Sequence, residues 1–223
     1  MRIGFLLGLL VPVSAAAAEP VRLFNGADLA GWAGVVEDSN ADPAKTWFVE
    51  DGLLKCGGKP KGYLRTERED FKDYVLRVEW RWPEGTPEKA NNGVLVHVSK
   101  PGALGVWPKS LEVQLAADNA GDFWVIPGRD SPDATEIDVP FEGVAGVERV
   151  LGRRHLNFTE GSERPRGEWN EMEVVCRGDT VAVRVNGEIV NYGFNSNVTQ
   201  GAIAIQSEGA AVEFHKVELT PLE

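Results

Sequence analysis

Short segments of alternating apolar and polar residues, separated by turn residues, dominate this 223-residue chain. A period of two places successive side chains on opposite faces of a β-strand. The clearest such segment lies between Phe71 and Trp82 and ends at Pro83, which cannot donate a ladder hydrogen bond. Its apolar row consists of Tyr74, Leu76, Val78, Trp80 and Trp82. No stretch shows a helical period of useful length, so the chain is predicted to be all-β.

The same pattern, bounded by Gly, Pro, Asn and Asp, predicts further strands along the chain. A hairpin is expected at 47–56 around Asp51-Gly52, and Asn186-Gly187 predicts a type I′ turn. Other strands are expected at 63–66, 91–98, 110–115, 169–177, 180–185, 189–190, 201–206 and 211–219. The acidic stretch 130–148 is predicted to be a long solvated loop. Strands at this spacing favour two packed antiparallel sheets, a sandwich or jelly roll.

The first 18 residues have the composition of a secretory signal peptide. Arg2 precedes an apolar run, and small residues at Ala16 and Ala18 form a cleavage signal before Glu19. The run is shorter than the ~20 residues needed to span a bilayer. We therefore predict a signal peptide at 1–18, a single domain at 19–223, and a periplasmic or secreted mature protein that is not held in the membrane.

The charge balance restricts the classes of partner. The net charge is −11, and removal of Arg2 with the leader makes it one unit more negative. An acidic chain argues against nucleic acid and anionic membranes as partners. A neutral small molecule or a carbohydrate fits this charge better.

The two cysteines, Cys56 and Cys176, leave two interpretations open. An oxidising compartment would allow a disulfide. Alternatively both are buried free thiols, because cysteine is among the most buried residues. Cys176 belongs to an apolar row of its strand, which points inward.

The strand 110–115 carries the most informative polar face. Leu111, Val113 and Leu115 alternate with polar residues, among them Glu112 and Gln114. The pleat places this carboxylate and this amide about 6.6 Å apart on one face. The pair is suited to grip one small polar ligand, beside a predicted Gly121-Asp122-Phe123-Trp124 turn. The alternative is an ordinary solvated face.

Other strands carry polar residues opposite their apolar rows. In a curved sheet these residues can line one groove, although cross-strand ion pairs on a solvated face are an equal alternative for the arginines. The candidates are Arg77, Glu79, Arg81, His97, Gln206 and Glu208. The unperturbed pKa of a histidine would suit His97 to act as a base near neutral pH, but a lone histidine on an apolar strand is more often structural. Trp107 and Trp124, expected in or beside loops, suit the C–H faces of sugars or anchor those loops.

Ordinary catalytic signatures, such as Gly-x-Ser-x-Gly or His-Glu-x-x-His, are missing from the sequence. The chain nevertheless resembles the 3-keto-disaccharide hydrolase domain family over nearly all of its predicted mature length. An ordered set of short motifs carries this resemblance: Leu23-Phe24-Asn25-Gly26, Leu29-x-Gly31-Trp32, Asn91-x-Gly93, Glu112-Val113-Gln114, Gly167-Glu168-Trp169-Asn170, Asn186-Gly187, Ile205-Gln206-Ser207-Glu208-Gly209 and Glu213-Phe214. The resemblance implies a concanavalin A-like, LamG-like jelly-roll sandwich of two antiparallel sheets.

The resemblance also implies action on a disaccharide or glycoside whose C3 hydroxyl has been oxidised to a ketone. Elimination across C1 and C2 requires a base, an acid, and a donor or divalent metal ion on the enolate. The sequence identifies no cofactor. His97 or Glu112 is expected as base, and Gln114 with Arg81 would hold the sugar. Glu79 or Glu208 would act as acid or metal ligand.

Two other functions are compatible with an all-β sandwich of this kind. A two-carboxylate glycosidase is disfavoured because Gln114 and Ala116 follow Glu112 where a jelly-roll glucanase carries further carboxylates. A non-catalytic, lectin-like glycan-binding module uses the same architecture. Such a module would present Trp107 and Trp124 as an aromatic platform, whereas an enzyme would bring His97, Glu112 and Gln114 together in a pocket.

Overall fold

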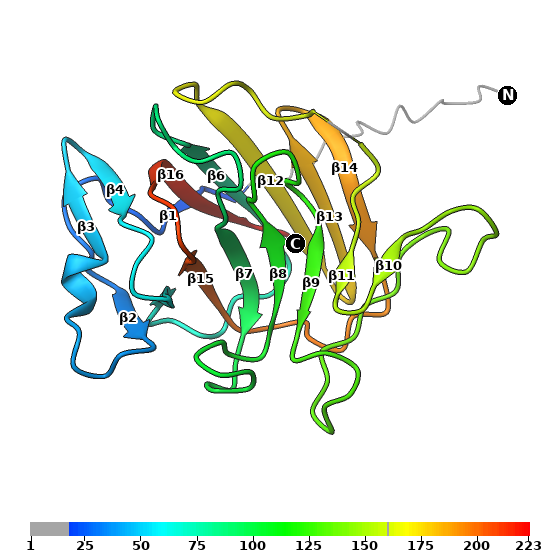
Figure 1. Ribbon diagram of the computed structural model, residues 1–223. Helices are drawn as coiled ribbons and strands as arrows, with labels where there is room; N and C mark the ends of the chain where they lie inside the picture. The colour runs from blue at the N-terminus through cyan, green and yellow to red at the C-terminus, as the bar shows by residue number, and fades with distance from the viewer. Residues whose placement is uncertain (1–17, 160) are drawn as a thin grey trace, which may run out of the picture.

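Two packed antiparallel sheets form the protein, as a computed structural model of residues 18–159 and 161–223 shows (Figure 1). The predicted signal peptide lies, apart from Ala18, outside these described residues. Within them, no helix is long and apolar enough to cross a membrane. The only helical turn in the same ranges is the 3-10 segment η1 (Pro43–Lys45).

Sheet A contains eight strands. Their order is β14 (Glu188–Gly193), β13 (Thr180–Val185), β12 (Asn170–Arg177), β6 (Tyr74–Arg81), β16 (Val212–Pro221), β4 (Leu53–Cys56) and β3 (Trp47–Glu50), with β1 (Val21–Arg22) paired to β16. Sheet B also has eight strands. Their order is β10 (Val150–Leu151), β11 (Arg154–His155), β9 (Phe123–Ile126), β8 (Ser110–Gln114), β7 (Gly93–Val98), β15 (Ala202–Ser207), β5 (Gly62–Thr66) and β2 (Trp32–Val36).

This architecture confirms the predicted all-β sandwich and most of its strands. The hairpin β3–β4 turns at Asp51-Gly52, and β13–β14 turns at Asn186-Gly187. The sequence interpretation missed β1, β2, β10 and β11. It also placed Trp124 beside a loop, whereas this residue lies in β9. β1, β10 and β11 have two residues each, and β2 (Trp-Ala-Gly-Val-Val) shows no alternation of apolar and polar residues.

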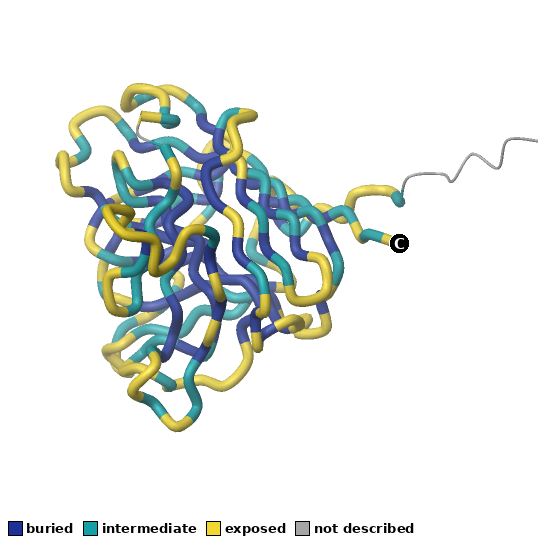
Figure 2. The backbone as a smooth tube through the Cα atoms, turned by 90° about the vertical axis from the view of Figure 1, so that its right-hand side faces the viewer, coloured by how far each residue is buried: buried dark blue, intermediate teal, exposed yellow. Residues whose placement is uncertain are grey.

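The apolar rows meet between the sheets. The row of β6 is fully buried, and so are Leu111, Val113 and Leu115 at β8. Figure 2 shows the buried backbone in the interior and the exposed backbone mainly at loops and turns. Cys56 and Cys176 are both buried free thiols, the second of the two interpretations above.

Sheet B also buries apolar residues on its outer face, the face that points away from sheet A. Leu95 of β7 and Ile126 of β9 belong to this second cluster, together with Tyr63 of β5. Val106 and Trp107, from the loop 99–109, pack against it. This loop therefore covers part of the outer face of sheet B and creates a partly closed site on it.

Candidate functional site

A small pocket of about 130 Å³ lies on the outer face of sheet B. Strands β8, β9 and β15 supply most of its walls, and the loop carrying Trp107 covers it. The residues that line it are Asn91, Trp107, Glu112, Gln114, Trp124, Ile126, Arg153, Gln206 and Glu208. We call it the Glu112 pocket.

Strand register explains why these side chains meet. In sheet B, β7 lies between β8 and β15, and Gly93 of β7 is the partner of Gln114 of β8. Gly93 has no side chain to separate its neighbours. A Cβ at this position would lie 2.6 Å from Oε1 of Glu112 and 2.8 Å from Oε1 of Gln206. Gly93 thus leaves the space in which Glu112 and Gln206 approach each other across a strand.

Glu112 is the most perturbed carboxyl of the pocket. Only 5% of the residue is exposed. Burial raises the pKa of its carboxyl to about 8, and the nearby charge of Glu208 adds to this rise; Gln206 and Arg153 oppose it. A carboxyl with this pKa exchanges a proton near neutral pH, as a general acid or base must.

Glu208 and Arg153 place further charges beside Glu112. Burial raises the pKa of Glu208 as well, and the charges of Lys61 and Arg153 reduce that rise. The guanidinium of Arg153 lies 5.2 Å from the centre of the Trp124 ring. Its charge lowers the pKa of both carboxyls, whereas Lys61 lies 3.7 Å from Glu208 and acts on that carboxyl.

Three buried polar atoms of the pocket residues find no hydrogen-bond partner among residues 18–159 and 161–223. They are Oδ1 of Asn91, Oε1 of Gln206 and Nε1 of Trp124. Buried polar groups are usually paired, because an unpaired one costs about 1–3 kcal/mol. Two unpaired acceptors and one unpaired donor on residues that line one small pocket therefore favour a polar ligand.

Gln114 is held by its own backbone. Its Oε1 accepts hydrogen bonds from the N–H groups of Leu115 and Ala116, at 3.1 and 3.3 Å. The amide NH₂ is then the group that this side chain presents to a ligand. Gln114 thus supplies a donor of fixed position.

His97 does not belong to this pocket, and the prediction that it faces the groove is wrong. Its backbone adopts a φ of 56° beside a register shift between β7 and β15. This local irregularity turns the side chain toward sheet A, where its ring contacts Tyr74 edge-on. Its Nδ1 lies 2.9 Å from the Val198 carbonyl, and burial lowers its pKa to about 4. An imidazole enclosed between the sheets, outside the Glu112 pocket and with so low a pKa, cannot serve as the base there.

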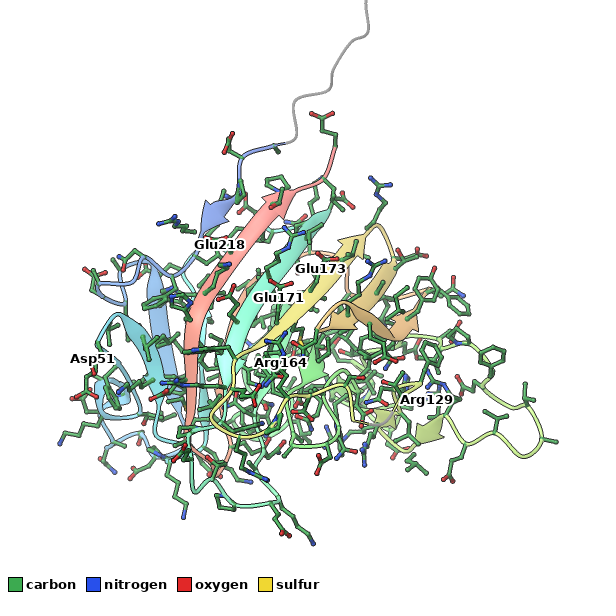
Figure 3. The ribbon with its side chains drawn as sticks, turned by 90° about the horizontal axis from the view of Figure 1, so that it is seen from above. Asp51, Arg129, Arg164, Glu171, Glu173 and Glu218 are labelled. Atoms are coloured by element: carbon green, nitrogen blue, oxygen red, sulfur yellow. The ribbon has the colours of Figure 1, made fainter. Side chains whose placement is uncertain are left out.

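Glu79 and Arg81 also lie elsewhere, on the outer face of sheet A. Glu79 accepts from Nδ1 of His215 at 2.9 Å and pairs with Lys216. Arg81 donates to Glu213 at 2.7 Å and stacks on Trp169. Figure 3 views this sheet from above, with Glu171, Glu173 and Glu218 labelled along its strands. The sequence could not separate the polar faces of the two sheets, because both have the same alternation.

Comparison with known proteins identifies the family. Residues 19–220 match the model of the 3-keto-alpha-glucoside-1,2-lyase-like domain. The chain belongs to this family. This membership confirms the resemblance found in the sequence and supports a carbohydrate-active role.

Solved structures show how widely this fold is used. A candidate glycosyl hydrolase from Parabacteroides distasonis is similar at 22% identity, over 92% of this chain and 94% of that one, with a TM-score of 0.62. A carbohydrate-binding module from Bacillus subtilis is similar at 10% identity, over 84% of this chain and 93% of that one, with a TM-score of 0.56. A β-glucanase from Bacillus licheniformis is similar at 9% identity, over 93% of this chain and 100% of that one, with a TM-score of 0.54. At these identities the likeness concerns the jelly-roll fold alone. A search of curated proteins gave no match.

Asn91 and Arg153 line the Glu112 pocket but were not predicted from the sequence as site residues. The only sequence signal for Asn91 was its place in the Asn91-x-Gly93 motif. Arg153 precedes the two-residue strand β11 and follows the long loop 130–148. No pattern in the sequence could have placed it, because its position depends on the pairing of β11 with β9.

The pocket offers oxygen atoms rather than a nitrogen or sulfur cluster. No group of three or more His, Cys, Asp or Glu side chains suited to a metal ion occurs in the described part of the chain. Glu112, Glu208 and the amide oxygen of Gln206 are the oxygen donors that a hard divalent cation would use. The divalent metal ion stays a prediction.

Proposed function

We propose that this protein cleaves 3-keto-glycosides or 3-keto-disaccharides by elimination across C1 and C2, followed by hydration. The observation that carries the proposal is the buried Glu112 carboxyl in a small pocket with a second carboxyl and a guanidinium. The family to which the chain belongs supports the same chemistry by its description.

The reaction has simple requirements. A ketone at C3 acidifies the hydrogen on C2, so a base removes that proton and an enolate forms. The enolate electrons then form the C1–C2 double bond as the bond from C1 to the leaving oxygen breaks. An acid protonates the leaving oxygen, and addition of water across the double bond gives the free 3-keto sugar.

The pocket residues suit these steps. Glu112, with a pKa of about 8, acts as the base that removes the C2 proton near neutral pH. Arg153 stabilises the negative charge on the enolate oxygen. Glu208, whose pKa is also raised, protonates the leaving oxygen. Gln114, Gln206 and Asn91 bind the hydroxyls of the sugar, and Trp124 and Trp107 contact its apolar face.

The decisive experiment compares wild type with Glu112→Gln on a 3-keto-disaccharide and on its unoxidised parent, with and without a divalent metal ion. We expect the wild type to cleave only the keto substrate, and the variant to lose about 10²–10⁴-fold in turnover, since general base catalysis contributes that much. A melting temperature no lower than that of wild type shows that the variant is folded. Unchanged turnover by the variant removes Glu112 from the mechanism. No cleavage of any keto substrate by wild type, together with binding of the unoxidised sugar, favours a glycan-binding module instead.

We also propose that the protein is exported, on the basis of the leader sequence at 1–18. Fractionation of expressing cells, with N-terminal sequencing of the mature chain, tests this. Recovery in the periplasm or medium with Glu19 as first residue is expected. A cytoplasmic protein that begins at Met1 contradicts it.

A further inference from the structure

A second depression, of about 590 Å³, lies on the same outer face of sheet B. Its lining includes Asp118, Asn119, Arg154, Asn157, Phe158 and Thr159. We call it the Arg154 pocket. None of its lining residues belongs to the Glu112 pocket.

Strand register places the two pockets side by side. Glu112 of β8 is the partner of Trp124 in β9, and Trp124 is the partner of Arg154 in β11. Directly paired residues point to the same face of a sheet, with strands about 4.8 Å apart. Figure 1 shows β8, β9 and β11 in this order. Trp124 lines one pocket and Arg154 the other, so the pockets are neighbours along one face.

Arg153 and Arg154 are consecutive in the sequence but line different pockets. Arg153 lines the Glu112 pocket, where its guanidinium lies over Trp124. Arg154 lines the second pocket, where it donates to Asp122 at 2.6 Å and to Asn119 at 2.5 Å. These bonds fix its guanidinium, so the second pocket has a rigid polar wall.

The lining of the Arg154 pocket suits a sugar ring. Phe158 is 40% exposed, and the Arg149 guanidinium lies 4.1 Å from the centre of its ring, so the side chain offers at most one apolar face. Asn119, Asn157 and Thr159 place amide and hydroxyl groups near it. Each is hydrogen-bonded within the protein, but each amide NH₂ keeps a second N–H for a ligand. An aromatic surface with a few polar groups is the combination that binds pyranose rings.

The Glu112 pocket is too small to enclose more than the reacting sugar. Its volume of about 130 Å³ is below the ~300–1,000 Å³ of pockets that enclose drug-sized ligands. A second sugar on the leaving side must therefore lie against another part of the same face.

We propose that the Arg154 pocket is the subsite for the leaving-group sugar, and that the enzyme prefers disaccharides to glycosides of small alcohols. The proposal rests on the proposed function for its assignment of the reacting sugar to the Glu112 pocket.

The test is Phe158→Ala, measured with a 3-keto-disaccharide and with a methyl 3-keto-glucoside. We expect kcat/KM for the disaccharide to fall roughly tenfold, because an aromatic contact is lost, and kcat/KM for the methyl glycoside to stay the same. Phe141→Ala is the matched control, since Phe141 is 61% exposed and lines neither pocket. Equal losses on both substrates, or an unchanged preference for the disaccharide, overturn the proposal.

Thr159→Val removes one hydroxyl at similar volume, and we expect a smaller loss in the same direction. If Phe158→Ala does not fold, Thr159→Val tests whether the Arg154 pocket binds the leaving-group sugar.

Calorimetric binding separates this proposal from the proposed function. If wild type cleaves no keto substrate, the unoxidised disaccharide and methyl glucoside are titrated instead. Tighter binding of the disaccharide that Phe158→Ala abolishes supports the subsite, although the proposed function has failed. Equal binding of both sugars, or no binding of either, overturns the subsite.

Discussion

The outer faces of the two sheets arise from the same alternating pattern, but their polar groups differ in whether they find hydrogen-bond or ion-pair partners within the protein. On sheet A, Arg77 pairs with Glu173 and Arg81 with Glu213, across neighbouring strands and in contact with solvent. On sheet B, Glu112 is buried, and the Oε1 of Gln206 has no partner among the described residues.

The cover over the face accounts for this difference. The loop 99–109 packs Val106 and Trp107 onto sheet B, and it is held at Lys100 and Lys109 by ion pairs to Asp133. The cover shields the polar groups beneath it from bulk solvent, so that they can bind a ligand. A polar strand face becomes a site when a loop covers it.

The largest effect should appear in the pH dependence of stability. Glu112 holds a proton in the folded state up to about pH 8, whereas its ordinary pKa is 4.5. Below pH 4.5 both states are protonated. Between about 4.5 and 8 only the unfolded state ionises, so stability falls as pH rises, by up to about 5 kcal/mol. Urea unfolding of wild type and Glu112→Gln from pH 4 to 9 measures this; the variant should show a smaller decline, because the raised pKa values of Glu163 and Glu208 remain.

Glu79 on sheet A provides the contrast. Desolvation raises its pKa, but hydrogen bonds from Lys216 and His215 outweigh that rise and lower the pKa overall. Glu79 therefore stabilises the fold above its ordinary pKa of 4.5, and this contribution is lost as pH falls. Glu79→Gln should be less stable than wild type above about pH 4.5, and the two curves should approach each other as the pH falls. Parallel curves for wild type and both variants would contradict the distinction between the faces.

The next effect concerns the space that Gly93 leaves for Glu112 and Gln206. A Cβ at Gly93 forces both side chains to move, because it would lie within 3 Å of each. Displacement of this kind costs roughly 10²-fold in activity, and overpacking costs about 1–3 kcal/mol in stability. We expect these losses for Gly93→Ala, in turnover of a 3-keto substrate and in urea unfolding.

Gly57→Ala is the matched control, because a Cβ there meets only the Thr46 carbonyl oxygen, at 3.8 Å. It should keep full turnover. Full turnover of Gly93→Ala as well would mean that the close approach of Glu112 and Gln206 is not needed.

The smallest effect is expected on sheet A. Arg77 and Glu173 are cross-strand partners with a 2.7 Å contact, and the arginine side chain is 41% exposed. Exposed ion pairs contribute about 0.2–1 kcal/mol. A double-mutant cycle of Arg77→Ala and Glu173→Ala should give a coupling energy in this range and leave turnover unchanged. A loss of turnover would show that sheet A also takes part in function.

The sequence predicted the local features of the molecule well. Alternation identified the buried row of β6 and the polar pair Glu112 and Gln114, because the period of a strand is visible within a few residues. The ordered motifs identified the family. Alternation did not reveal β9 in full, nor the two-residue strand β11, since too few residues repeat.

Only the tertiary structure decided which polar residues share a face. Gln206 reaches Glu112 because β7 and β15 pair across about a hundred residues of chain, whereas Glu79 lies in the other sheet. The left-handed backbone at His97 turned that side chain inward, and the pairing of β11 with β9 brought in Arg153. Strand pairing and local bulges depend on contacts between distant residues, and the period of a single strand contains no information about them.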